Sequence, residues 1–167
     1  IIGSLLHDVG KVIYRTGDDK RKHSISGYDF LRDEAGVADD AILNCVKYHH
    51  ADAIRTADIA VDDIAYITYI ADNIASAADR RRQGSEDVGF EISAPLQSVF
   101  NILNGNSGSM VYSPGMLNAE KGINYPTETV IKFDEHFYAR VKENLLGNLK
   151  GISYDSEYVN SLLDVME

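Results

Sequence analysis

Apolar residues recur every three or four positions along much of this chain, which is the spacing of one helix face. In segment 39–51, Ile42, Cys45 and Val46 follow this spacing, and Asp39-Asp40 suits a helix N-terminus. The pattern predicts further helices at 1–15, 24–31, 62–82, 134–149 and 155–166. We therefore expect a mainly α protein, built as a helical bundle.

Segment 62–82 is the strongest helix candidate, because Asp62-Asp63 and Arg80-Arg81-Arg82 match the helix dipole at its two ends. Asp72 lies on a lane of small polar residues and is flanked by alanines, so its carboxylate is expected to be paired or bound to a metal. The expected buried stripe of this helix consists of Ile64, Ile67, Ile70 or Ala71, Ile74 and Ala78.

Polar and irregular segments separate these helices. Segment 16–23 is predicted to be a loop, with Ser24 as the N-cap of the helix that follows. All three prolines fall within 92–132, where 111–112 and 130–133 are candidate short strands or a hairpin. We predict an all-helical core at 1–90 and an extension at 91–167, in which loops and short strands precede the last helices.

The composition limits the classes of protein to which this chain can belong. A chain of 167 residues with 44% hydrophobic residues supports a real core. No apolar run is long enough to span a membrane, and the single Cys45 excludes an internal disulfide, so we expect a cytoplasmic protein. The net charge of −10 argues against unspecific nucleic-acid binding but suits a metal site. The chain opens without Met and stops directly after a predicted helix, so we expect further residues at both ends.

The candidate chemistry begins with His7 and Asp8, which interrupt an apolar stretch near the start of the chain. Taken alone, the pair is more often a buried histidine beside a helix-capping aspartate. Further potential ligands in the first half, however, come from two other predicted helices and one loop, so that with the His-Asp pair three helices and one loop contribute. Because a helical domain builds a central metal site in this way, we expect a metal centre. The expected ligands are His7, Asp8, His23, His49, His50 and Asp72.

These six groups are enough to hold one metal fully or two metals that share Asp8. Two metals about 3.5–4 Å apart suit phosphodiester hydrolysis. Lys11 follows His7 by one helical turn and is expected to contact a phosphate or the developing charge. The predicted catalytic residues are therefore His7, Asp8 and Lys11.

Several segments together resemble the HD superfamily of metal-dependent phosphohydrolases. They are His7-Asp8-Val9-Gly10-Lys11, His23, Tyr48-His49-His50-Ala51 and Ala71-Asp72-Asn73-Ile74-Ala75-Ser76. The His-Asp pair stands first and no histidine precedes it. This order is similar to the circularly permuted HD domain in the large subunit of type III-A CRISPR interference complexes. Segments 95–103 and 122–126 also look like that subunit.

The resemblance implies a single-stranded DNA nuclease that works with the other subunits and the guide RNA of a CRISPR ribonucleoprotein, in antiviral defence. It implies that His7, Asp8, Asp72 and either His49 or His50 are metal ligands, and that His23 is a further ligand or a substrate contact. The metal would be manganese, nickel or cobalt, with magnesium less suited to a histidine-rich site. The extension would then lead to a palm domain outside these residues. Two alternatives stay open: an HD enzyme acting on a nucleotide, and a structural module with a vestigial site.

Two further features of the sequence are candidate contacts for a DNA strand. Arg80 and Arg81, near Arg55 and the 20–22 loop, are candidate substrate-binding residues, although a solvated basic helix end explains them equally well. The ten tyrosines suggest base stacking, but most fall on apolar helical patterns and are expected in the core.

Overall fold

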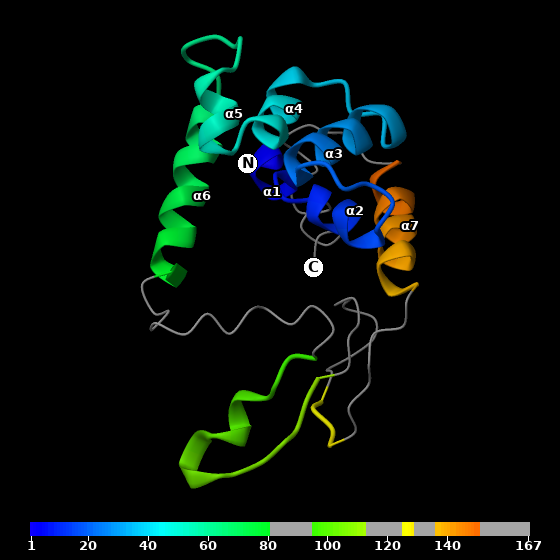
Figure 1. Ribbon diagram of the computed structural model, residues 1–167, viewed down its shortest axis with the longest axis vertical. Coiled ribbons are helices and arrows are strands. Elements are labelled where there is room, and N and C mark those ends of the chain that lie inside the picture. Colours follow the sequence, from blue (N-terminus) through cyan, green and yellow to red (C-terminus); the bar gives the residue numbers. More distant parts are fainter. Residues whose placement is uncertain (81–94, 113–124, 129–135, 151–167) are drawn as a thin grey trace. The chain divides into compact units, whose positions relative to one another are not determined.

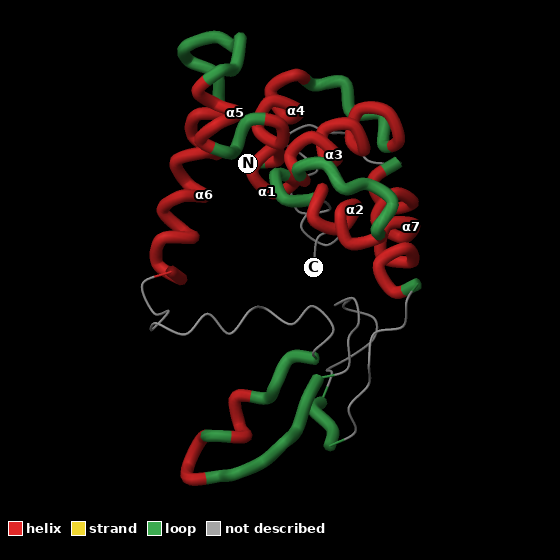
Figure 2. The backbone as a smooth tube through the Cα atoms, in the orientation of Figure 1, coloured by secondary structure: helices red, strands yellow, loops and turns green. Residues whose placement is uncertain are grey.

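A computed structural model describes residues 1–80, 95–112, 125–128 and 136–150 (Figures 1 and 2). The chain forms two compact units, Ile1–Asp87 with Tyr138–Met166 and Val88–Phe137 with Glu167. The elements of the first unit are α1 (Ile2–Leu6), α2 (Gly10–Thr16), α3 (His23–Asp29), η1 (Phe30–Glu34), α4 (Asp40–Lys47), α5 (Ala51–Arg55), α6 (Ala65–Arg80) and α7 (Phe137–Leu149), which begins at the last residue of the second unit.

The mainly α architecture is confirmed. Residues 138–149 of α7 belong to the same unit as α1–α6, and the predicted domain boundary at residue 90 stays a prediction. The predicted helices at 62–82 and 134–149 correspond to α6 and α7, which begin at Ala65 and Phe137, whereas the predicted helix at 155–166 lies outside the described residues. No described helix is long and apolar enough to cross a membrane.

The predicted helix 1–15 is wrong in one respect, because it is broken at His7–Val9. The backbone there bonds three residues back, from the N–H of Val9 to Leu6 and from the N–H of Lys11 to Asp8, at 3.0 and 2.9 Å. Such bonds wind the chain more tightly than an α-helix. α1 and α2 are therefore two short helices that meet at the His-Asp pair.

The ends of the next helices also differ from the sequence pattern. Ser24 is not the N-cap of α3: Lys22 holds that position and Ser24 is buried within the helix. The predicted cap of α4 is confirmed, since the Asp39 carboxylate accepts from the N–H groups of Ala41 and Ile42 at 2.8 and 3.2 Å. α4 ends at Lys47, so His49 and His50 lie in the turn before α5 rather than on the predicted helix.

α6 presents the opposite face to the one expected. Ile67, Ile70 and Ile74 are 67%, 54% and 68% exposed, so the predicted isoleucine stripe is wrong as a buried surface. The buried side of the helix is the polar lane, in which Thr68 accepts or donates a 2.9 Å hydrogen bond with Ser4 of α1. Small side chains allow α6 to lie against α1 and α4, and this packing turns Asp72 toward the first helices.

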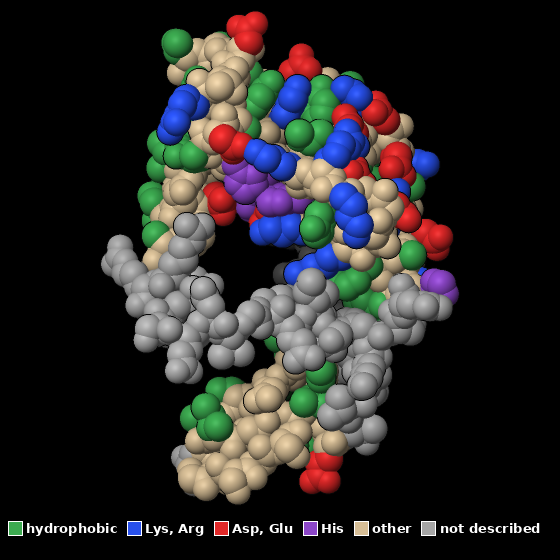
Figure 3. Space-filling model, viewed as in Figure 1, with side chains coloured by type: hydrophobic (Ala, Val, Ile, Leu, Met, Phe, Trp, Pro, Cys, Tyr) green, Lys and Arg blue, Asp and Glu red, His purple; other side chains and the backbone are tan. Residues whose placement is uncertain are grey.

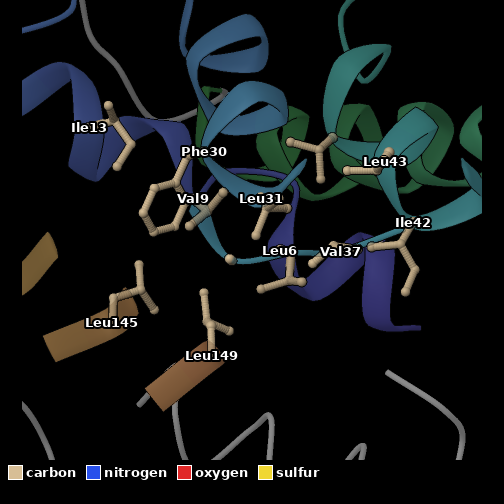
Figure 4. Packing of buried hydrophobic residues seen from close by; sticks show 12 residues of the cluster. Leu6, Val9, Ile13, Phe30, Leu31, Val37, Ile42, Leu43, Leu145 and Leu149 are labelled. Carbon is tan, nitrogen blue, oxygen red and sulfur yellow. The ribbon is translucent and has the colours of Figure 1, made fainter. Parts of the chain in front are cut away.

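The core of the first unit lies between α1–α4, η1 and α7 (Figure 4). Leu6 and Val9 enter it from either side of the His-Asp pair, and both are buried. Leu145 and Leu149 enter it from α7. The His-Asp pair is therefore fixed by two core side chains. The cluster consists of Leu6, Val9, Ile13, Phe30, Leu31, Ala35, Val37, Ile42, Leu43, Val46, Leu145 and Leu149.

The described part of the second unit is a looped segment with the short helical turns η2 (Val99–Asn101) and η3 (Leu103–Gly105). The buried Asn101 side chain bonds both ways with the backbone of Met110, at 2.8 and 2.9 Å. Val111 forms antiparallel bridges with Gln97 and Thr127, and the candidate strand at 130–133 lies outside the described residues.

Candidate metal centre

The six predicted ligands come together in the first unit. His7 and Asp8 lie at the α1–α2 junction, and His23 is the first residue of α3. The turn between α4 and α5 provides His49 and His50, and α6 provides Asp72. Figure 3 shows histidine side chains gathered on one face of this unit, with acidic and basic groups beside them. Three helix junctions and one helix thus converge on a single centre.

Asp8 lies at the middle of this centre. Its Oδ1 is 3.2 Å from Nε2 of His23 and 3.8 Å from Nε2 of His49. Its Oδ2 is 3.4 Å from Nε2 of His7 and 2.5 Å from Nζ of Lys11. Oδ1 therefore faces two histidines, whereas Oδ2 faces His7 and the ammonium group of Lys11.

His7 and His49 are both held in the tautomer that suits a metal ligand. Nδ1 of His7 donates to the carbonyl of Ser4 at 2.6 Å, and Nδ1 of His49 donates to the carbonyl of Val46 at 2.7 Å. With the proton fixed on Nδ1, each Nε2 keeps its lone pair for a metal. Sequence reasoning missed both carbonyls, because no side-chain pattern reports a backbone acceptor.

The environment of His7 shows why a cation fits. Its Nε2 is buried without a hydrogen-bond partner and faces Asp8 and, at 3.6 Å, Oδ1 of Asp72. A nitrogen lone pair turned toward two carboxylate oxygens is unfavourable unless a positive charge lies between them. The set of one imidazole and two carboxylates is a suitable donor set for a divalent ion.

On the other side of Asp8, three imidazoles face one another. Nε2 of His23 is 3.1 Å from Nε2 of His49 and 2.9 Å from Nε2 of His50. One proton cannot satisfy all three nitrogens. A metal with nitrogen ligands at about 2.0–2.1 Å places neighbouring ligand atoms about 3 Å apart, so the spacing fits a bound ion. The nitrogens of His23, His49 and His50 thus form a cluster that could hold a metal ion.

The electrostatics keep these ligands in their metal-binding forms. Burial lowers the pKa of His49 to about 4, and the neighbouring His50 adds to that effect. Burial and the nearby His23 also lower the pKa of His50. Burial would raise the pKa of Asp8, but hydrogen bonds with His23 and Lys11 and the charges of His7 and Lys11 bring it well below its usual range. His49 and His50 therefore stay neutral and Asp8 stays ionised at neutral pH.

The other predicted site residues divide into two groups. Lys11 is exposed and lies beside Asp8, and its contact with the reacting phosphate stays a prediction. The side chains of Arg80 and Arg81 lie outside the described residues, so their role as substrate contacts stays a prediction.

The fold and the site point to one class of protein, because a bundle of short helices surrounds a cluster of histidines and aspartates. Residues 1–77 match the family model of the HD domain. In Mycobacterium tuberculosis (strain ATCC 25618 / H37Rv), a relative named CRISPR system single-strand-specific deoxyribonuclease Cas10/Csm1 (subtype III-A) is 35% identical over 195 residues. The alignment covers 100% of this chain and 24% of the relative, so the chain spans about a quarter of that protein's length.

Solved structures agree with this relationship. The crystal structure of Csm1 in T. onnurineus superimposes with a TM-score of 0.62 and 29% identity, over 93% of this chain and 22% of that one. A Csm1–Csm4 cassette in complex with cA4 gives a TM-score of 0.64 and 27% identity, over 99% of this chain and 22% of that one. The predicted resemblance to the III-A large subunit is confirmed.

Proposed function

We propose that this chain carries the metal-dependent single-strand deoxyribonuclease centre of a type III-A CRISPR effector. The observation that carries the proposal is the position of Asp8 between His7 with Asp72 on one side and the three further histidines on the other. A carboxylate shared between two metal positions is the arrangement used for phosphodiester hydrolysis. The name of the Mycobacterium relative supports single-stranded DNA as the substrate.

Each ligand has a proposed role. Asp8 would bridge two ions, His7 and Asp72 would complete one position, and His23, His49 and His50 would complete the other. Bound there, divalent ions supply a water of lowered pKa and stabilise the charge at phosphorus. Lys11 would hold a non-bridging phosphate oxygen or the developing negative charge. The imidazole-rich donor set favours manganese, nickel or cobalt over magnesium.

The openness of the centre supports a polymer substrate over a nucleotide. His7, His23 and Asp8 are 21%, 23% and 35% exposed, and the histidines are visible on the molecular surface in Figure 3. An enzyme for a single nucleotide encloses its ligand in a pocket that buries most of it.

The similar Csm1 chain was solved as a cassette with a second protein, Csm4. That pairing supports a further proposal, that this chain works inside the cell within a multisubunit complex that holds the guide RNA.

A cleavage assay tests the function. The chain is incubated with labelled single-stranded DNA and a panel of Mn²⁺, Ni²⁺, Co²⁺ and Mg²⁺, with the double variant His7→Ala, Asp8→Ala beside it. We expect cutting by the native chain, strongest with a transition metal, and loss of at least a hundredfold in the variant. Asp62→Asn, an exposed aspartate before α6, is the matched control.

Two outcomes would count against the proposal. Cleavage that survives in the double variant would place the activity elsewhere. Intact DNA with every metal, from native protein that binds the metals, would favour the vestigial site.

A further inference from the structure

The exposed side of α2 carries a cationic and aromatic strip that begins at the metal centre. Lys11, Tyr14 and Arg15 stand at positions i, i+3 and i+4, so they share one helix face, and all three are exposed. Lys11 contacts Asp8, which joins this face to the centre. Lys20 of the following loop completes the group, and we call these four residues the α2 strip.

Neighbouring contacts hold the strip in place. Nζ of Lys20 lies 5.8 Å from the centre of the Tyr14 ring. The Arg15 guanidinium donates to the Tyr138 hydroxyl of α7 at 2.8 Å and lies 5.3 Å from the centre of the Tyr138 ring. Charges and rings therefore alternate along one surface of the first unit.

Tyr14 is the informative member, because the sequence pattern placed most tyrosines in the core. It is 47% exposed, and among the described tyrosines only Tyr14 and Tyr125 are exposed while the others are half-buried, so the expectation fails for these two. A ring that leaves half its surface in water adds little to packing. Its open face suits a flat partner instead.

Nearby basic groups outside the strip are held by carboxylates. Arg21 is bound to Asp19 and Asp29, and Lys22 is paired with Asp52. Within the strip, Lys11 is bound to Asp8, whereas Lys20 is placed against the Tyr14 ring. In a chain of net charge −10, this is a local surface that can attract a polyanion.

We propose that the α2 strip is the binding subsite for the substrate strand next to the metal centre. The inference rests on the proposed function and names how that site holds its substrate. Lys11, Arg15 and Lys20 contact successive backbone phosphates, and one unpaired base stacks on Tyr14. Because a stacked base must expose its face, the subsite selects a single strand over a duplex.

Binding without metal tests the strip separately from the chemistry. Fluorescence anisotropy with EDTA present measures the affinity of the chain for a labelled single-stranded DNA, an RNA of the same sequence and a DNA duplex. We expect Tyr14→Ala to weaken single-strand binding about tenfold and to leave duplex binding unchanged, whereas Tyr14→Phe restores it. Lys20→Ala should weaken both and lower the salt dependence by about one charge. Arg32→Ala removes an exposed charge bound to Asp29 and Asp33, and it is the matched control.

A second readout separates this inference from the proposed function. Hydrolysis of bis(4-nitrophenyl) phosphate with Mn²⁺ needs the metal centre but offers no long strand, so Tyr14→Ala and Lys20→Ala should change it less than twofold. Loss of that hydrolysis in the native chain would count against the proposed function alone. Native-like single-strand binding by Tyr14→Ala, or an equal loss in Arg32→Ala, would overturn the strip. A loss on RNA but not on DNA would overturn DNA as its ligand.

Discussion

Gly10 and Gly27 face each other where α2 crosses α3. A Cβ on Gly10 would lie 1.8 Å from the carbonyl oxygen of His23 and 2.7 Å from the backbone nitrogen of Gly27. Only hydrogen at Gly10 allows the two helices to approach this closely. The crossing brings His23 to Asp8, so the backbone of two glycines sets the geometry of one side of the metal centre.

Gly10→Ala should therefore destabilise the chain by about 3 kcal/mol, because the clash is with backbone atoms that cannot rotate away. Urea denaturation measures the effect. Gly147→Ala in α7 is the control: its Cβ would have open space, and a helix interior favours alanine by about 0.5–1 kcal/mol. A Gly10→Ala chain as stable as the native one would mean that α2 and α3 separate freely.

The number of metal ions bound should depend on the ligands on each side of Asp8. The native chain is expected to bind about two Mn²⁺ ions, and Asp72→Asn about one, since the histidine side stays intact. Equilibrium dialysis followed by elemental analysis gives the ratio. Asp62→Asn should keep the native ratio, and a native ratio in Asp72→Asn would remove Asp72 from the ligands.

Acid should weaken the metal-free fold through His49. Its pKa is about 4 in the folded chain against about 6.5 when unfolded, so the unfolded chain takes up the proton first as the pH falls. The stability from neutral His49 is complete above about pH 6.5 and is lost as the pH falls toward 4, by a few kcal/mol at most.

Urea midpoints at pH 7 and pH 5 with EDTA measure this loss. His49→Gln should reduce the difference between the two midpoints. An undiminished difference in His49→Gln would assign the acid sensitivity to other groups.

The cap of α4 offers a test away from the metal centre. Asp39→Ala removes the acceptor of two backbone N–H groups and should cost about 1 kcal/mol of stability, measured by thermal unfolding. Asp40→Ala removes an acid of the first helical turn without a cap and should cost clearly less. Equal effects would show that charge alone matters there.

The sequence predicted the helices and the ligands wherever the type of a residue indicates what its immediate surroundings must provide. His7, Asp8, His49 and Asp72 could be found because charged or polar groups beside apolar positions need a partner. It failed where tertiary packing decides. The isoleucines of α6 look like a core stripe, yet the small polar lane lies against α1 and Ile67, Ile70 and Ile74 face solvent.

The carbonyls that orient His7 and His49 could not be predicted either. They depend on where α1 and α4 end, since His7 and His49 follow these helices and turn Nδ1 back to a carbonyl three residues earlier, and sequence does not report that end point. Close helix crossings cannot be predicted from the sequence either. Gly10 and Gly27 are separated by a loop, and the reason for these glycines is visible only in the packing of α2 against α3.

The tight turn at residues 7–9 has a consequence for insertions and deletions. Leu6 and Val9 are anchored in the core with two residues between them. One residue added or removed there would rotate the following side chain by about 100°. Either Asp8 would leave His23 or Val9 would leave the core. The spacing of this motif is therefore as strongly constrained as its composition, and working relatives should differ around it by substitution rather than by length.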